Sequence, residues 1–345
     1  MKRFIYKTSF FLIPIILMYF ISLVFYSATE SPDLLRLGCI PNIYKNYRAK
    51  FSLTEEIKYD DLSNPKSSKY KILTIGDSFS EQAGLGYKNI LANNFSVLHV
   101  DRFISNNQIQ TLINFTNGNF FDHYNVEYVI LQNVERHFID NAKNIHLNEK
   151  IMVNEIDSII LNRKIKQEKY LYNFFAKTTI KFPLYNFPKF FLQKNYLANK
   201  NVYNVELNTP LLFSNKSSKL LFYHKDLKST EENNNPRNID SLNAVLNTIT
   251  LKLRQRNIKL IVLPSPDKYD LYYDYIAEKK GFTKPIFFDL MKAQKKDYIY
   301  IDSKAVLKAN IKSKQDIYYY DDTHWSPVAS KIIANKIKGE IENNK

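Results

Sequence analysis

The feature that most constrains the fold is a series of short apolar segments of strand length, separated by stretches with helical spacing. These segments are rich in β-branched and aromatic residues, which favour extended structure. They cover residues 70–75, 95–100, 126–132, 258–263 and 298–302. Strands that alternate with helices are typical of a parallel sheet covered on both faces. The sequence therefore predicts an α/β fold with a mainly parallel five-stranded sheet.

Two segments between or after these strands have the clearest helical spacing. The first has an apolar face with three- and four-residue intervals, formed by Leu242, Val245, Leu246, Ile249 and Leu253. The second lies near the C-terminus, where Ser326 suits an N-cap and Pro327 the first helical position. Its apolar face comprises Val328, Ile332, Ile333 and Ile337. We expect both helices to cover the sheet.

The interval between the third and fourth predicted strands is much longer than one crossover helix requires. We therefore predict an inserted subdomain at about residues 140–238, within a main domain of residues 70–345. Inside the insertion, residues 174–192 interleave aromatic side chains with lysines. This pattern fits a small secondary core, and it also fits stacking on sugars or contact with lipid head groups.

The first 28 residues are predicted to form a membrane anchor, followed by a linker or N-terminal extension over residues 29–69. Three basic residues, Lys2, Arg3 and Lys7, precede an uncharged stretch at 9–28, which has about the length needed to span a bilayer. This charge distribution favours a single-pass inner membrane protein with a cytoplasmic N-terminus and a periplasmic or extracytoplasmic domain. A cleaved signal peptide is the alternative, and it would place the domain in the same compartment.

Charge and cysteine content narrow the possible ligands. The 49 Lys and Arg residues exceed the 34 Asp and Glu residues, which gives a formal net charge of +15 at pH 7. The basic residues are scattered and no nucleic-acid-binding motif accompanies them, so we expect no nucleic-acid partner. Cys39 is the single cysteine and no Cys/His cluster has zinc spacing. We therefore predict no metal and no other cofactor.

Residues 76–81, Gly-Asp-Ser-Phe-Ser-Glu, directly follow the first predicted strand. Open α/β sheets bind ligands at the carboxyl ends of their strands, so Ser78 is expected at a catalytic edge. A helix starting near Phe79 would direct backbone N–H groups at an oxyanion on a substrate joined to Ser78. The same segment also fits a capping box, in which Ser78 and Glu81 cap a helix. The segment alone leaves a nucleophile and a helix cap open.

A nucleophilic serine needs a base, and the base needs a third group that fixes its tautomer. His324 follows two carboxylates, Asp321 and Asp322, in a loop that leads into the last predicted helix. The other histidines lack such a pattern: His99, His123, His137, His146 and His224. Spacing alone does not decide between the two aspartates. A purely structural loop, with His324 and Trp325 packed together, is the alternative.

These motifs together resemble the SGNH/GDSL hydrolase superfamily, which has Gly-Asp-Ser near the start and Asp-x-(x)-His near the end. Residues 322–327, Asp-Thr-His-Trp-Ser-Pro, look like the Asp-x-His-Trp block of its alginate O-acetyltransferase-like branch. Residues 262–269 are similar to that branch's strand-exit Pro-x-Lys segment and contain Lys268. The resemblance spans about residues 70–337 and implies a three-layer SGNH-like, flavodoxin-like fold. It implies Ser78 as nucleophile, His324 as general base and Asp322 as orienting acid.

One part of the motif pattern departs from the superfamily. Hydrolases of this group carry Gly-x-Asn-Asp after the third strand, whereas this chain reads Asn133-Val134-Glu135-Arg136. Arg136, oriented by Glu135, is a candidate to stabilise developing negative charge or to hold an anionic acceptor, and a structural ion pair is the alternative. Four residues are therefore candidates for oxyanion or substrate binding: Asn133, Arg136, Trp325 and Lys268. The Ser78 backbone N–H is a further candidate donor.

The resemblance implies an extracytoplasmic O-acetyltransferase that works through an acyl-serine and modifies a cell-surface or exported polysaccharide. It also implies a membrane O-acyltransferase as the partner that supplies the acetyl group. Two other functions remain open at this point. One is an SGNH esterase or deacetylase of glycans that uses the same triad. The other is an inactive glycan-binding or assembly scaffold, since fold alone does not decide function.

Overall fold

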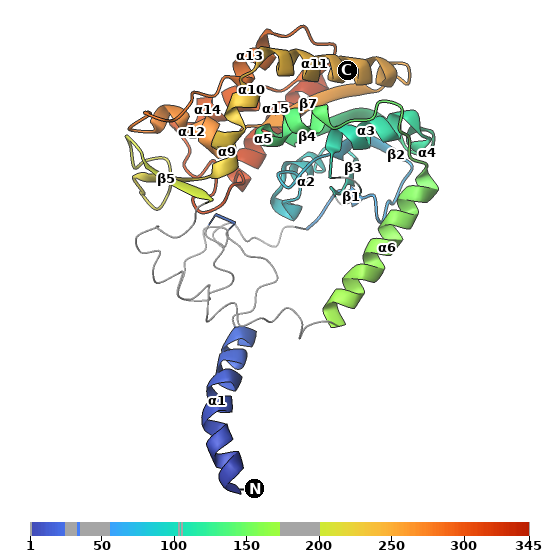
Figure 1. The fold of residues 1–345 in the computed structure, drawn as a ribbon. Helices are drawn as coiled ribbons and strands as arrows, with labels where there is room; N and C mark the ends of the chain where they lie inside the picture. Colours follow the sequence, from blue (N-terminus) through green and yellow to red (C-terminus); the bar gives the residue numbers. More distant parts are fainter. Residues whose placement is uncertain are drawn as a thin grey trace.

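The computed structural model describes residues 2–24, 33–34, 56–102, 104, 106–172 and 201–344 (Figure 1). Two features singled out from the sequence lie outside the described residues. These are Cys39 and the aromatic and lysine-rich segment at 174–192.

The centre of the molecule is a six-stranded, all-parallel sheet with the order β1-β3-β2-β4-β7-β8. Its strands are β1 (Asp60–Asp61), β2 (Lys69–Ile75), β3 (Val97–Val100), β4 (Asn125–Val134), β7 (Lys259–Ser265) and β8 (Ile299–Tyr300). Without β1, this is the 2-1-3-4-5 strand order of flavodoxin-like sheets. The predicted α/β class and parallel sheet are confirmed, and β1 adds a sixth strand at the edge beside β3.

Side chains that alternate along β4 build a separate core on each face of the sheet, as the pleat of a strand requires. Tyr128, Ile130 and Val134 face the core built with α2 (Tyr87–Leu91), α14 (Ser303–Ile311) and α15 (Pro327–Asn343). Val129 and Leu131 face the core built with α3 (Gln108–Asn117), α4 (Phe120–His123), α5 (Glu135–Lys143), α11 (Pro236–Arg254) and α13 (Phe287–Ala293). The sheet is therefore covered on both faces, which gives three layers.

The two predicted helices form as expected. In α11, Pro236 is at the helix start, the Asn235 side chain accepts a hydrogen bond from the Arg237 N–H, and the face around Leu246 is buried. In α15, Ser326 Oγ accepts a hydrogen bond from the Val328 N–H at 3.0 Å. Because the N-cap residue Ser326 directly follows Trp325, the capped N-terminus of α15 fixes where the preceding loop ends.

Several elements lie between β4 and α11, in the region of the predicted insertion. They are α5, α6 (Val153–Tyr172), the antiparallel strands β5 (Val202–Glu206) and β6 (Lys219–Tyr223), α9 (His224–Lys228) and α10 (Thr230–Asn233). Leu220, Leu221 and Phe222 of β6 are buried in the same core as α15. The β5–β6 pair therefore packs on the main domain. The predicted division into units stays a prediction.

The N-terminal helix α1 covers Lys2–Val24 and contains Pro14. Within the residues that the structure describes, no helix is both long enough and apolar enough to cross a membrane. The structure thus does not support the predicted anchor over residues 1–28. Lys2, Arg3 and Lys7 all fall in the first two turns of α1, which shortens its uncharged part.

Candidate active site

Asp77 fixes the turn that carries Ser78, which we call the Ser78 turn (residues 76–81). One carboxylate oxygen of Asp77 accepts the Phe79 N–H at 2.9 Å, and the other accepts the Val134 N–H at 2.6 Å. The Asp77 N–H donates to Gln132 Oε1 at 3.0 Å. Val134 and Gln132 belong to β4, so the turn is bound to the carboxyl end of the neighbouring strand.

Gly76 allows this turn to lie against a buried polar network. Ser80 Oγ donates to Gln132 Oε1 at 2.8 Å and shares a hydrogen bond with the Tyr87 hydroxyl at 2.8 Å. Gln132 Nε2 in turn donates to Ser265 Oγ on β7 at 2.9 Å. A Cβ at position 76 would lie only 2.0 Å from Ser80 Oγ and 2.7 Å from Gln132 Oε1. Only glycine fits this position without a displacement of its neighbours.

The helix expected near Phe79 is not there. Residues 78–80 form a turn, η2 (Ala83–Leu85) follows, and the first α-helix of this region is α2, beginning at Tyr87. Four N–H groups of the turn already have acceptors, those of Asp77, Phe79, Ser80 and Glu81. The Ser78 N–H has no acceptor in the part of the chain that the structure describes. It is therefore available to a substrate oxyanion.

Ser78, His324 and Asp322 form a continuous hydrogen-bonded line. Ser78 Oγ lies 2.8 Å from His324 Nε2, and His324 Nδ1 lies 2.6 Å from Asp322 Oδ1. The same carboxylate oxygen accepts the His324 backbone N–H at 3.0 Å. The Asp322 side chain is almost fully buried, whereas the His324 side chain is 16% exposed. This is the arrangement of nucleophile, base and orienting acid in a serine enzyme.

The two local alternatives for these motifs are not realised in this geometry. Glu81, the partner in the possible capping box, pairs with Arg102, whose Nε lies 2.9 Å from Glu81 Oε2. Asp321, the other possible orienting acid, presents its backbone carbonyl to the Leu34 N–H at 3.3 Å. The Nδ1 atom of His324 instead faces Asp322.

Trp325, which follows His324, is packed inside the protein and does not line an open surface. Its side chain is fully buried and packs edge-on against Phe79 with a ring-centroid distance of 5.2 Å. The Phe79 ring also packs on the His324 ring at 4.9 Å. The Trp325 carbonyl accepts a hydrogen bond from Gln82 Nε2 at 2.8 Å. The expected role of Trp325 in substrate binding therefore has no contact surface in this conformation.

Lys268, on α12 (Lys268–Tyr272), is also buried. Its ammonium donates to the backbone carbonyls of Tyr319 at 2.8 Å, Tyr320 at 2.6 Å and Asp322 at 3.3 Å. Burial lowers the pKa of Lys268 to about 8, against the opposing effect of the nearby Asp321 carboxylate. Lys268 thus holds residues 319–324, which we call the Asp-His loop, from the side of the protein interior.

Arg136 is engaged by aspartates and not by Glu135. Its Nη1 lies 2.6 Å from Asp267 Oδ1 and 3.3 Å from Asp226 Oδ1. Glu135 instead accepts the Asp267 backbone N–H at 3.0 Å. The predicted Glu135–Arg136 pair is wrong because both residues start α5, and consecutive residues of a helix do not face each other.

Asn133 lies in the interior as well. Its side chain is fully buried, and its Oδ1 accepts a hydrogen bond from Asn141 Nδ2 on α5 at 2.8 Å. Asn133, Arg136, Trp325 and Lys268 are thus all engaged or enclosed within the protein. Their assignment to oxyanion or substrate binding stays a prediction.

Asp33 is a site residue that the sequence pattern did not reveal. Its Oδ1 accepts the Thr323 N–H at 2.8 Å, its Oδ2 accepts the Thr323 hydroxyl, and Oδ2 lies 3.6 Å from His324 Nδ1. Burial raises the pKa of Asp33, and the neighbouring carboxylate of Asp322 raises it further. Nothing in the local sequence of Asp33 points to this contact, because its partners are 290 positions away.

Asp33, Asp322 and His324 also bring three metal-ligand atoms within 4.8 Å of one another. The 2.6 Å separation of His324 Nδ1 and Asp322 Oδ1 is a hydrogen-bond length. Two ligands held about 2.0–2.2 Å from a tetrahedral zinc ion would lie farther apart. The geometry therefore suits a hydrogen-bonded triad.

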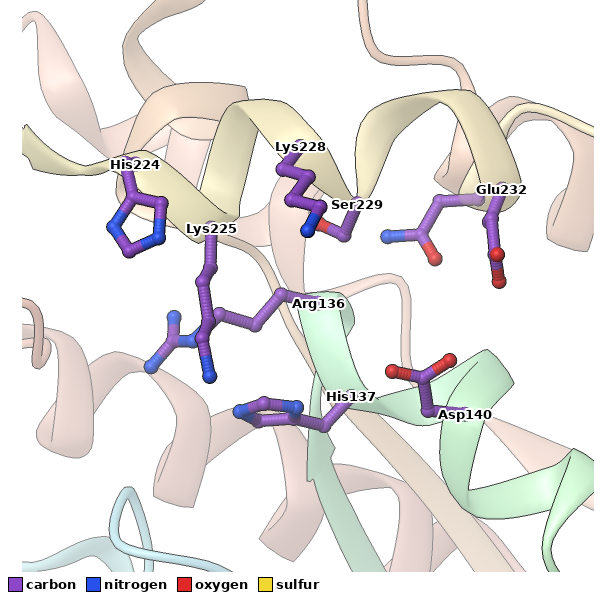
Figure 2. Close-up of a pocket in the computed structure, with 9 residues that line it drawn as sticks. Arg136, His137, Asp140, His224, Lys225, Lys228, Ser229 and Glu232 are labelled. Atoms are coloured by element: carbon purple, nitrogen blue, oxygen red, sulfur yellow. The ribbon is translucent and has the colours of Figure 1, made fainter. Parts of the chain in front are cut away.

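A cavity of about 290 Å³ opens between α5, α9 and α10 (Figure 2). Figure 2 shows the side chains of Arg136, His137 and Lys225 converging at one end, with Asp140 at the other. Burial lowers the pKa of His137, and the positive charge of Arg136 lowers it further, which favours a neutral imidazole. Because α5 follows Val134, whose N–H binds Asp77, the cavity lies at the same sheet edge as the Ser78 turn.

Comparison with known families gives a match to the C-terminal part of the chain. Residues 217–345 match the family model ALGX, described as the SGNH hydrolase-like domain of acetyltransferase AlgX. Searches of curated proteins and of solved structures give no match. The matched part includes Lys268, Asp322 and His324, and Ser78 precedes it. The match confirms the resemblance to the alginate O-acetyltransferase-like branch and supports an acetyltransferase-like or SGNH hydrolase-like function.

Proposed function

We propose that this protein is an O-acyltransferase that carries an acyl group on Ser78 and transfers it to a hydroxyl of an exported polysaccharide. The observation that carries the proposal is the 2.8 Å contact of Ser78 Oγ with His324 Nε2, in line with Asp322. A base within hydrogen-bond reach activates a serine hydroxyl at neutral pH, and the carboxylate fixes the tautomer of the base.

In the proposed first step, Ser78 Oγ attacks the carbonyl carbon of the acyl donor while its proton passes to His324 Nε2. The bond between the acyl carbon and the donor's leaving atom then breaks, and His324 returns the proton to that leaving atom. In the second step an acceptor hydroxyl gives its proton to His324 and attacks the acyl-serine. Ser78 is released with its proton restored, and the acceptor carries the ester.

We propose the Ser78 N–H as one donor to the oxyanion that forms in both steps. This is supported by the acceptors already assigned to four other N–H groups of the Ser78 turn, those of Asp77, Phe79, Ser80 and Glu81. A preorganised donor at this position stabilises the charge that develops in the transition state.

We propose that the polysaccharide is modified outside the cytoplasm and that a membrane O-acyltransferase partner supplies the acyl group, most simply acetyl. The cavity lined by Arg136, His137 and Lys225 offers polar contacts for a saccharide at the edge where Ser78 lies. Saccharide hydroxyls are recognised by such convergent polar groups.

The proposal is tested by exposing the full chain to 4-nitrophenyl acetate and measuring its intact mass. We expect one acetyl group on the protein, located at Ser78, and none on Ser78→Ala. His324→Ala should slow its formation strongly because no base then accepts the Ser78 proton. Acetylation that persists unchanged in Ser78→Ala would overturn Ser78 as the acyl carrier and favour an inactive scaffold.

The competing function is an esterase with the same triad, which the hydrolase-like character of the matched domain favours. The two differ only in what discharges the acyl-serine. Transfer predicts that candidate polysaccharides accelerate loss of the acetyl group and become acetylated themselves. Rapid discharge to water, at a rate that saccharides leave unchanged, would identify an esterase.

A further inference from the structure

Residues 33 and 34, which precede the sheet in sequence, contact the Asp-His loop. Leu34 is 1% exposed, lies in the core shared with α15, and donates its N–H to the Asp321 carbonyl at 3.3 Å. A buried apolar side chain next to a backbone hydrogen bond fixes the segment on the domain. Asp33, the preceding residue, is therefore held at a defined place.

Asp33 contacts the loop through its backbone and through both carboxylate oxygens. Its N–H donates to Asp322 Oδ2 at 3.4 Å, and its carboxylate accepts the N–H and the hydroxyl of Thr323. Lys268 binds carbonyls of the same loop from the interior. The loop that carries Asp322 and His324 is thus bound by two charged side chains, those of Asp33 and Lys268.

The Nδ1 atom of His324 faces two carboxylates. Asp322 makes the hydrogen bond at 2.6 Å, and Asp33 Oδ2 lies 3.6 Å away. At that distance a negative charge on Asp33 attracts positive charge on the ring, and solvent around the 37% exposed Asp33 side chain weakens this attraction. The Ser78 hydroxyl lies on the opposite ring nitrogen.

Two basic side chains near His324, Lys268 and Arg136, are separated from it by other groups of the protein. The Lys268 ammonium lies behind the backbone carbonyls of the Asp-His loop. The Arg136 guanidinium lies over the Phe79 ring at 5.9 Å from its centroid, and that ring also packs on His324. Among the ion pairs of described residues, two carboxylates lie within 4 Å of His324 Nδ1, those of Asp322 and Asp33.

We propose that Asp33 is a positioning residue of the catalytic site, a second carboxylate that fixes the Asp-His loop and stabilises the imidazolium formed during acyl transfer. The catalytic part of this proposal rests on the proposed function, whereas the contacts of Asp33 with the Asp-His loop do not. Asp33 is then a working part of the site, within residues that the sequence assigns to a linker or N-terminal extension. Its contribution is separable into a charge effect and an alignment effect.

The first test compares the wild-type chain with Asp33→Asn and Asp33→Glu, using 4-nitrophenyl acetate as substrate. We expect Asp33→Asn to lower kcat roughly tenfold with little change in KM, because alignment of the base is lost. In a plot of kcat against pH, the acid side of the profile (the acid limb) should also move by about half a pH unit to lower pH. The reason is that a negative charge near the imidazolium is gone. Asp33→Glu, which keeps the charge, should return the limb toward its wild-type position.

Asp60→Asn is the matched control. The Asp60 carboxylate likewise accepts a hydroxyl, that of Tyr70 at 2.7 Å, and a backbone N–H, that of Lys66 at 3.1 Å. Tyr70 is near the start of β2, at the end of the strand opposite the Ser78 turn. Asp60→Asn should leave the acid limb in place. An acid limb that is equally unmoved in Asp33→Asn would overturn the proposal.

The second test needs no activity and therefore separates this inference from the proposed function. In a Ser78→Ala background, the imidazole resonances of His324 are followed by NMR as pH is varied. The added Asp33→Asn change should lower the midpoint of this titration. An unchanged midpoint would refute the charge effect of Asp33, even if Ser78 proves to be the acyl carrier. A lowered midpoint would support the charge effect, even if Ser78 proves not to carry the acyl group.

Discussion

At the scale of single residues, Gly76 is a position of the Ser78 turn that has no room for a side chain. We expect Gly76→Ala to destabilise the protein by about 1–3 kcal/mol, because the added Cβ would collide with Ser80 Oγ and Gln132 Oε1. Denaturant unfolding monitored by circular dichroism measures this change. Gly339→Ala is the control, because a Cβ there meets nothing within 4 Å in the helix α15.

For Gly339→Ala the sign should be the opposite, a gain of roughly 0.5–1 kcal/mol, since alanine is the better helix former. If Gly76→Ala proved as stable as the wild type, the turn would have room that the close contacts at Ser80 and Gln132 do not suggest.

The choice between Asp321 and Asp322 is also a question about single residues. Asp322→Asn keeps the shape of the side chain but favours the wrong tautomer of His324. We expect acetyl transfer from 4-nitrophenyl acetate to slow by about 10³–10⁴-fold with thermal stability nearly retained. Asp321→Asn should retain much more activity, because the His324 Nδ1 contact is made by Asp322. Equal losses in the two variants would contradict the assignment.

At the scale of elements, α12 and the Asp-His loop are joined through Lys268. Lys268→Met removes the donor to three buried carbonyls, at Tyr319, Tyr320 and Asp322. We expect about 1–3 kcal/mol of lost stability and a lower kcat, because unpaired buried carbonyls are costly and the loop loses its inner support. Urea unfolding and esterase assays measure the two effects. Lys331→Met, on the exposed face of α15, should change neither quantity.

The elements that the sequence predicts well are those whose pattern is local. Each of the five apolar segments corresponds to an observed strand of the central sheet. The strands β1 and β5 lack such a pattern, because β1 is Asp-Asp and β5 mixes polar and apolar residues with no fully buried position. In place of the helix expected near Phe79, the N–H groups of Ser80 and Glu81 donate to carbonyls three residues back and close turns.

The site divides in the same way. Ser78, Asp322 and His324 stand in short motifs, so the sequence identifies them as candidates. The direction of a side chain depends on tertiary packing, and the sequence therefore does not show that Lys268 points into the interior. Asp33 was missed because its contacts join segments that are far apart in the chain.

At the scale of the whole molecule, buried charge makes stability depend on pH. Lys88 is 2% exposed and its ammonium lies 4.2 Å from the centroid of the Tyr59 ring. Burial lowers the pKa of Lys88 to about 7, and the nearby carboxylate of Glu81 opposes this shift. Between pH 7 and about 10.4 the unfolded chain holds a proton that the folded protein does not, so stability from this group rises with pH.

Lys88→Met removes this dependence while keeping a long apolar side chain. Its advantage in free energy of unfolding over the wild type should be largest below pH 7, at up to about 4 kcal/mol, and should shrink as pH rises toward 10. Chemical denaturation at a series of pH values measures the difference. Lys280→Met changes an exposed lysine and should give a flat difference. A flat profile for Lys88→Met as well would refute the effect of burial.

The contact between Ser78 and His324 joins two positions 246 residues apart, and the chain's single tryptophan, Trp325, is next to this junction. Its buried indole packs on Phe79, a residue of the Ser78 turn whose ring also packs on His324. The protein thus contains an intrinsic optical probe at the point where its two distant motifs meet. Fluorescence at Trp325 should therefore report on whether the Ser78 turn and the Asp-His loop are in contact, before any substrate is added.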